Sequence, residues 1–197
     1  MLGLSEMSWR HIVLFALVLV WVIFARAHGT PPSVVVAGGV LVMLGEALRI
    51  WATGHIRKNK VLTLGGPYRY VRDPMYIGSL LIGTGFTLAG RQFALLLIFW
   101  LIYFVYYIPR KRRIECERLL RLFGDAYANY MAAVRSLIPR LTPYQGAEQS
   151  KFSWRQSVDN HEPGIILILV TAAAVLCVKS VWLRAEIPLP AWLSPWF

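Results

Sequence analysis

The sequence predicts an all-α, polytopic membrane protein with about five transmembrane helices. Two observations lead to this prediction. The chain is 57% hydrophobic and only 16% charged, whereas soluble domains are usually about half apolar. The apolar residues also come in blocks near the length that crosses the ~30 Å hydrocarbon core of a bilayer, about 20 residues of helix. We therefore expect many of these side chains to face lipid.

Five apolar segments are candidate spans, at residues 12–25, 34–52, 75–89, 93–108 and 164–183. They predict one integral membrane domain over residues 1–197. The third and fourth are separated only by Gly90, Arg91 and Gln92. A tight helical hairpin is expected there, because lipid tolerates no exposed irregular backbone. The first segment has an alternative interpretation as a signal peptide, since Arg10 and His11 precede its short apolar run.

The net charge of +11 is concentrated beside the second and fourth spans. Basic loops stay in the cytosol. Two regions, 53–74 and 109–140, are therefore expected on the cytosolic side, with the amino terminus also inside and the carboxyl terminus on the opposite side. In a soluble protein this charge would suggest a nucleic-acid partner, which we do not expect here. A simpler interpretation is that the charges set topology and contact anionic headgroups.

Short helices and turns are predicted within the two cytosolic regions. The sequence Gly65-Gly66-Pro67 indicates a turn. Helical apolar spacing predicts an amphipathic helix over 110–123 that ends at Gly124, followed by a second short helix that carries Tyr127. Such helices lie along the headgroups and would roof a membrane cavity. The polar stretch 142–162 indicates a surface linker to the last span.

The most informative block is GPYRYVRDPMY at residues 66–76, where the loop joins the third span. Part of this block would serve only to start a helix, because Asp73 suits an N-cap and Pro74 the first helical position. Its tyrosines could likewise be aromatic side chains at the membrane interface.

The block as a whole resembles the Gly-x-Tyr, Arg-His-Pro-x-Tyr signature of the isoprenylcysteine carboxyl methyltransferase and phospholipid methyltransferase superfamily. A second match lies downstream, at the spacing of that family's acidic helix, Phe-Gly pair, paired tyrosines and closing Val to Pro segment. Its residues are Glu115, Leu119, Phe123, Gly124, Tyr127, Tyr130, Val134 and Pro139. Both matches lie between residues 49 and 140, about half of the chain.

The resemblance implies an integral membrane methyltransferase that uses S-adenosylmethionine and releases S-adenosylhomocysteine. It implies a lipid or lipidated acceptor, such as the carboxylate of a prenylated cysteine or a similar hydrophobic acid. The family's substrate-facing arginine falls on Lys111, with Arg112 beside it. Its cofactor contacts fall on Lys60, Val61, Leu62, Thr63, Tyr68, Asp73, Pro74, Met75, Tyr76 and Glu115.

Three residues depart from the family pattern. Asp73 stands where the family has histidine, and Cys116 where it often has a second glutamate. An ionised Asp73 cannot donate a hydrogen bond, so it would engage the amino group or sulfonium of the cofactor. Lys111 lacks the bidentate fork of arginine. It also stands one helical turn before Glu115, so the alternative for Glu115 is a surface ion pair worth ~0.3–0.5 kcal/mol.

Two polar features fall inside predicted spans. Glu46 and Arg49 stand one turn apart in the second span. Buried ions in lipid are candidates for function, but mutual pairing near the cytosolic end is the favoured interpretation. Gly83-Thr84-Gly85 lies in an apolar run with no preceding strand, which indicates close helix packing and not a nucleotide loop.

No catalytic base is needed if the acceptor is a carboxylate, which is already nucleophilic, and the sequence identifies no catalytic residue. His55 and His161 are isolated, Cys116 and Cys177 fall in different regions, and neither a metal site nor a disulfide is expected. Three alternatives stay open: a phospholipid N-methyltransferase with Asp73 or Glu115 as base, a nicotinamide-dependent sterol-type reductase, and a non-enzymatic membrane scaffold.

Overall fold

A computed structural model of the chain describes residues 31–57, 61–145 and 151–160. Every regular element in this part of the chain is helical, as predicted. The predicted spans at 12–25 and 164–183, with the signal-peptide alternative, lie outside the described residues. Two helices, Pro32–Thr53 and Phe93–Ala133, are long and apolar enough to cross a membrane, and Pro74–Ala89 is a shorter apolar helix.

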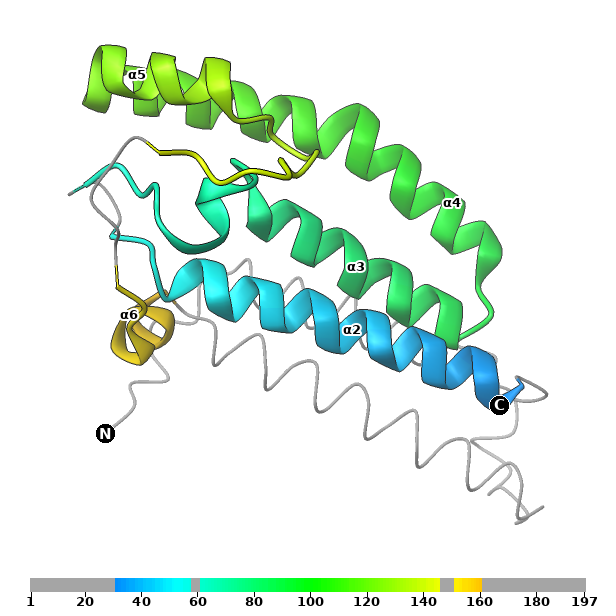
Figure 1. The fold of residues 1–197 in the computed structure, drawn as a ribbon. Coiled ribbons are helices and arrows are strands. Elements are labelled where there is room, and N and C mark those ends of the chain that lie inside the picture. The colour runs from blue at the N-terminus through cyan, green and yellow to red at the C-terminus, as the bar shows by residue number, and fades with distance from the viewer. Residues whose placement is uncertain (1–30, 58–60, 146–150, 161–197) are drawn as a thin grey trace, which may run out of the picture.

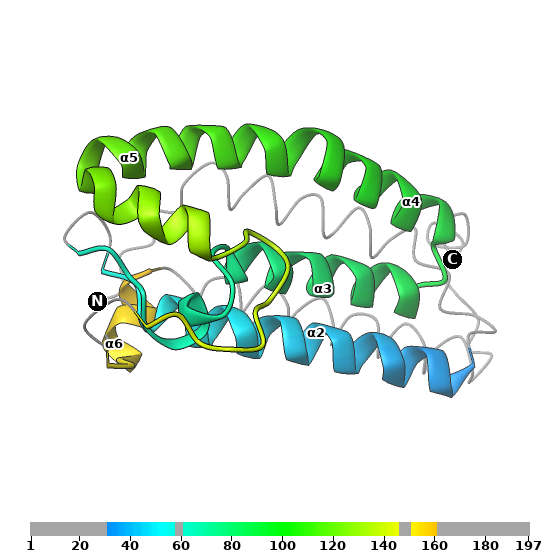
Figure 2. The same ribbon diagram turned by 45° about the horizontal axis from the view of Figure 1, so that its top comes forward.

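Helices α2 (Pro32–Thr53) and α3 (Pro74–Ala89) match the second and third predicted spans and lie side by side in Figures 1 and 2. Glycines let the two backbones approach closely. A Cβ atom added at Gly45 would lie 2.6 Å from the carbonyl oxygen of Gly78, and one added at Gly38 would lie 2.5 Å from that of Gly85. The pairing of 38 with 85 and 45 with 78 makes the helices antiparallel and confirms the packing role expected for Gly85.

The predicted hairpin between α3 and α4 (Phe93–Leu101) is confirmed. Gly90 N–H donates to the Phe86 carbonyl and Gln92 N–H to the Thr87 carbonyl, which closes the turn within three residues. Phe99 then packs against Gly83, and the Trp100 indole N–H donates to Thr84 Oγ1 at 3.0 Å. These contacts hold α4 along α3 in the antiparallel direction.

The helix that carries the fourth predicted span does not stop at residue 108, and the amphipathic helix expected over 110–123 is its continuation. The π-helical segment η3 (Ile102–Tyr107) continues α4, and α5 (Ile108–Ala133) continues η3 without a break. Proline has no N–H and its ring opposes the carbonyl four residues earlier, which here belongs to Val105. The π segment ends two residues before Pro109 and opens the turn at this position, so the helix passes through the proline.

Gly124 interrupts α5 where the sequence predicts a helix end. Its φ of 52° and ψ of −130° lie in a region that only glycine adopts easily. The helical residues after Gly124 therefore fold back beneath the first part of α5, as Figure 2 shows. The predicted second short helix is present and carries Tyr127 and Tyr130, both buried.

Two further segments surround the loop after α2. Residues 134–145 run beside η2 (Gly66–Arg69) and the residues that follow it. Tyr144 N–H donates to the Arg69 carbonyl, and Arg72 N–H donates to the Arg135 carbonyl. The short helix α6 (Trp154–Asp159) lies at the end of α2. Ser153 N–H donates to the Gly54 carbonyl and Asn160 Nδ2 to the Thr53 carbonyl, so the predicted linker is partly helical and anchored.

Candidate cofactor site

A cavity of about 590 Å³ lies where α2, the loop before α3, α3 and α5 meet. Polar and aromatic side chains from all four segments line it. Near α2 and α3 its wall is made by Arg49, Pro74, Met75, Tyr76 and Ser79, and on the loops by Ile56, Arg57, Val61, Leu62, Thr63, Tyr68, Arg72 and Asp73. The continuous helix formed by α4, η3 and α5, called the long helix below, contributes Tyr107, Lys111, Glu115, Arg118, Leu119, Phe123, Tyr127 and Tyr130.

Tyr76 and Glu115 form the central polar contact of this wall. The Tyr76 hydroxyl donates to Glu115 Oε2 at 2.5 Å, which joins α3 to α5. Lys111 Nζ lies 3.8 Å from Glu115 Oε1, so the expected ion pair one turn earlier is present. The Lys111 and Glu115 side chains are 40% and 32% exposed, which leaves the carboxylate accessible from the cavity and the ion pair weak.

Asp73 stands at the N-cap position of α3, but its side chain makes no capping hydrogen bond, and the capping role expected from the sequence was wrong. Its carboxylate instead accepts a hydrogen bond from the Ser136 hydroxyl and lies 3.6 Å from Arg72 Nε. Burial raises the pKa of Asp73, and the Ser136 hydrogen bond and the Arg72 charge oppose that rise only in part. The carboxyl group is thus largely buried on the cavity wall, beside Arg72 and Ser136.

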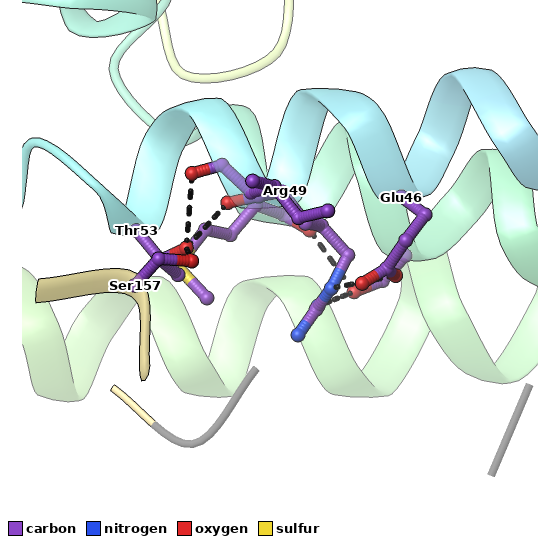
Figure 3. Close-up of polar contacts among 7 residues, drawn as sticks. Glu46, Arg49, Thr53 and Ser157 are labelled. Atoms are coloured by element: carbon purple, nitrogen blue, oxygen red, sulfur yellow. Dashed lines mark hydrogen bonds and ion pairs between the residues drawn. The ribbon is translucent and has the colours of Figure 1, made fainter. Parts of the chain in front are cut away.

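Arg49 lies at the α2–α3 end of the cavity, and its side chain is 10% exposed. Its Nη1 donates to Ser79 Oγ at 2.7 Å, and its Nε lies 3.9 Å from Glu46 Oε2. The predicted i, i+3 pair is therefore confirmed, and Figure 3 shows the two side chains facing each other along α2. Lysine or arginine at this depth is unusual in an apolar helix and is a candidate for function.

Buried tyrosines fix the loop that forms the cavity's opposite wall. Tyr130 donates its hydroxyl to the Tyr68 carbonyl at 2.8 Å. Tyr130, Tyr127, Val134 and Leu64 form one apolar cluster, against which Leu62 packs. The turn at Gly66 is required, because its φ is 57° and an added Cβ atom would meet the His55 ring. His55 therefore serves packing here, and its Nδ1 contacts the Trp51 carbonyl at 2.8 Å.

Nine of the ten predicted cofactor residues line this one cavity, and the tenth, Lys60, lies outside the described residues. Lys111 also lines it, whereas Arg112 does not, and the charge of Arg112 acts on Asp73 instead. Sequence reasoning did not identify Arg57, Ser79, Tyr107 and Arg118 as lining residues. Arg118 and Tyr107 had one available signal, since Arg118 stands three residues after Glu115 and Tyr107 eight residues before it along a helix.

Among the described residues, no group of three or more histidine, cysteine, aspartate or glutamate side chains could hold a metal ion.

Comparisons with known proteins identify the family of this chain. A family model described as phospholipid methyltransferase matches residues 33–126, which include most of the cavity wall. The chain is also 30% identical over 99 residues to the protein-S-isoprenylcysteine O-methyltransferase of Schizosaccharomyces pombe, across 50% of this chain and 42% of that relative. The chain belongs to the phospholipid methyltransferase family. The resemblance found in the sequence is thereby confirmed.

Another relative is not named as a methyltransferase. The chain is 30% identical over 142 residues to the cobalt-zinc-cadmium resistance protein CzcN of Cupriavidus metallidurans, across 70% of this chain and 65% of the relative. The chain thus spans 65% and 42% of the lengths of these two relatives. No solved structure matches it. Phospholipid methyltransferase family members are membrane methyltransferases that depend on S-adenosylmethionine.

Proposed function

We propose that this chain is an integral membrane methyltransferase that transfers a methyl group from S-adenosylmethionine to the carboxylate of a lipid-like acid at the cytosolic membrane face. The observation that carries the proposal is the convergence of nine predicted cofactor residues, from segments far apart in the sequence, on one cavity. Family membership supports the cofactor. The charge of the cavity wall supports an acidic acceptor, and the basic residues beside the second and fourth predicted spans support the cytosolic side.

Tyr76 and Glu115 suit the cofactor end of the cavity. A glutamate carboxylate can accept both hydrogen bonds of a ribose diol. Tyr76 holds Glu115 through its hydroxyl, and tyrosine rings attract a sulfonium by cation–π interaction. Asp73 is the further anionic group on the wall, and it would attract the ammonium or sulfonium group.

The charge of the cavity wall favours an anionic acceptor. Among the described lining residues, Arg49, Arg57, Arg72, Lys111 and Arg118 are cationic, and only Asp73 and Glu115 are anionic. S-adenosylmethionine itself carries a net positive charge, so it does not account for this excess of cations. A carboxylate near Arg49 and Ser79 would complement it, with the acceptor's lipid tail among the apolar helices.

The proposed reaction balances without a proton transfer. A carboxylate oxygen of the acceptor attacks the methyl carbon, a C–O bond forms, and the C–S bond breaks in line. The sulfonium becomes the neutral thioether of S-adenosylhomocysteine, and the acceptor becomes a methyl ester. The protein has to align the two reactants and exclude water, which can lower the barrier by several kcal/mol.

A second candidate is phospholipid N-methylation, which Asp73 favours. An amine acceptor must lose a proton when it gains a methyl group, so a base is needed. Burial raises the pKa of Asp73, which makes its carboxylate a stronger base than that of an exposed aspartate. The cationic excess on the wall weighs against an amine, and we therefore rank this candidate second.

Calorimetry on the detergent-purified chain tests the cofactor. S-adenosylmethionine and S-adenosylhomocysteine should bind saturably and NADPH should not. Glu115→Ala and Tyr76→Ala should weaken binding by roughly tenfold or more, because hydrogen bonds to charged groups are worth ~1.5–3 kcal/mol. Glu117→Ala is the matched control, since Glu117 is 56% exposed and pairs with Arg113 away from the cavity. Binding of NADPH alone would indicate a reductase, and binding of neither ligand a scaffold.

A further inference from the structure

From residue 99 to residue 115, every fourth residue of the helix formed by α4, η3 and α5 faces the same side. Phe99 packs against Gly83 of α3, and Tyr103 donates its hydroxyl to the Tyr76 carbonyl at 2.7 Å. Lys111 and Glu115 then line the cavity, together with Tyr107. Residues from 99 to 115 in steps of four thus all face α3 or the cavity.

A regular α-helix cannot keep these residues on one side. It turns about 100° per residue, so each step of four overshoots a full turn by about 40°. Over the four steps from Phe99 to Glu115 the drift reaches roughly 160°, which would put Glu115 on nearly the opposite face. A π-helical segment turns less per residue, because its hydrogen bonds join residues five apart. The segment Ile102–Tyr107 therefore cancels much of the drift.

Aromatic contacts show which residues the reduced turn of the π-helical segment brings together. The rings of Tyr103 and Tyr107 stack with centroids 5.2 Å apart and planes at 20°. Tyr107 also meets the Tyr76 ring edge-on, at 6.0 Å and 72°. Tyr76 is therefore held at three points by the long helix: its carbonyl by Tyr103, its ring by Tyr107 and its hydroxyl by Glu115.

We propose that the π-helical segment Ile102–Tyr107 sets the register of the long helix, and that Tyr103 and Tyr107 are positioning residues that align Tyr76 with Glu115. The inference rests on the proposed function, because it concerns how the cofactor end of that site is built. It predicts that one extra residue is present in this segment relative to a regular helix. Removing that residue should preserve the register, whereas adding another should destroy it.

The test compares two variants of a common parent, Pro109→Ala, in which a regular helix is free to form because the proline ring is gone. One variant deletes Val105, which is 68% exposed. The other inserts an alanine after Val105. The deletion should leave the affinity for S-adenosylhomocysteine within about threefold of the parent, and the insertion should lower it by roughly tenfold or more, since it turns Glu115 by about 100°.

A second measurement reports the register without the cofactor. In a chain with Cys116→Ser and Cys177→Ser, the pair Tyr76→Cys and Glu115→Cys should react with a short bifunctional thiol crosslinker in native membranes. The control pair, Tyr76→Cys with Glu117→Cys, should not. Crosslinking should survive the deletion and be lost on the insertion. Repeating both changes at Tyr106, which is 60% exposed, guards against a folding defect peculiar to one site.

Equal loss of crosslinking in the deletion and insertion variants would overturn the inference, because it would mean that the helix is regular. Survival in both would also overturn it, because Glu115 would not depend on the register. If crosslinking follows the prediction while no variant binds S-adenosylhomocysteine, the register stands and the proposed function fails.

Discussion

The Ser136 hydroxyl donates a hydrogen bond to the Asp73 carboxylate and so ties the segment after α5 to the start of α3. The backbone repeats the connection, because Asp73 N–H donates to the Ser136 carbonyl at 3.1 Å. The Asp73 side chain therefore binds the segment after α5 and does not cap α3, although Asp73 stands in the capping position.

Asp73→Asn should stabilise the protein at neutral pH. Burial raises the folded-state pKa of Asp73 above its unfolded value, so the folded state binds the proton more tightly. The ionised carboxylate therefore lowers the free energy of unfolding at pH values above the folded-state pKa. This loss of stability disappears as the pH falls to 3.8, the pKa of Asp73 in the unfolded state. Asparagine keeps an oxygen that accepts from Ser136 and carries no charge.

Thermal unfolding of both proteins in detergent from pH 4 to pH 8 measures this difference. The midpoint of Asp73→Asn should exceed that of the unmodified chain at pH 7, and the gap should narrow toward pH 4. A gap that widens on acidification would mean that Arg72 and Ser136 dominate over burial.

Gly45→Ala should destabilise the α2–α3 pair by about 1–3 kcal/mol, because its Cβ atom would overlap the Gly78 backbone. Gly39→Ala is the matched control in the same helix. No atom lies within 4 Å of a Cβ added at Gly39, so alanine should leave stability unchanged or raise it by up to ~1 kcal/mol through helix propensity. Chemical denaturation in mixed micelles compares the two, and equal effects would contradict the antiparallel packing.

Thr53→Val should weaken the attachment of α6. Thr53 of α2 and Ser157 of α6 meet at the end of α2 (Figure 3). Their hydroxyls are buried and lie 3.2 Å apart. Loss of one partner leaves a buried hydroxyl and should cost about 1–2 kcal/mol of unfolding free energy. Ser157→Ala should cost less, because the Thr53 hydroxyl still donates to the Arg49 carbonyl at 2.8 Å, and the double variant should cost clearly less than the sum. Additive costs would show that the two hydroxyls do not interact.

Arg49→Gln should act on the acceptor and not on the cofactor. We expect the KM for an acidic acceptor to rise by roughly tenfold or more, because a charge-assisted hydrogen bond is worth ~1.5–3 kcal/mol. The affinity for S-adenosylhomocysteine should change by less than about threefold. Arg113→Gln is the control, since its side chain is 83% exposed and pairs with Glu117. An equal rise in both variants would assign the effect to general surface charge.

Local sequence patterns predicted much of this fold. Glycine and proline marked the turn at Gly66 and the break at Gly124, and both positions have a positive φ that glycine tolerates. The apolar blocks at 34–52 and 75–89 match α2 and α3 within two residues. The family resemblance added the candidate cofactor residues, which no periodicity could have identified.

The failures arose where a distant contact overrides a local preference. The apolar block ends at residue 108 and a separate helix was expected from residue 110, but the π segment lets one helix continue through Pro109. Asp73 has the ideal residue type for a cap, but Ser136, far along the chain, takes its carboxylate. Arg57 and Ser79 join the cavity through the packing of α2 on α3 and the folding back of the loop, which a single sequence does not encode in any local pattern.

The most direct test of the central claim is methyl transfer itself. The purified chain, in vesicles that contain phospholipids and a fatty or prenylated acid, would receive S-adenosylmethionine labelled in its methyl group. Label should enter the lipid fraction and be released as methanol by mild alkali, which hydrolyses methyl esters and leaves N-methyl groups intact, and Glu115→Ala should abolish it. Alkali-stable label would assign an amine acceptor, and the absence of any Glu115-dependent label would contradict the account.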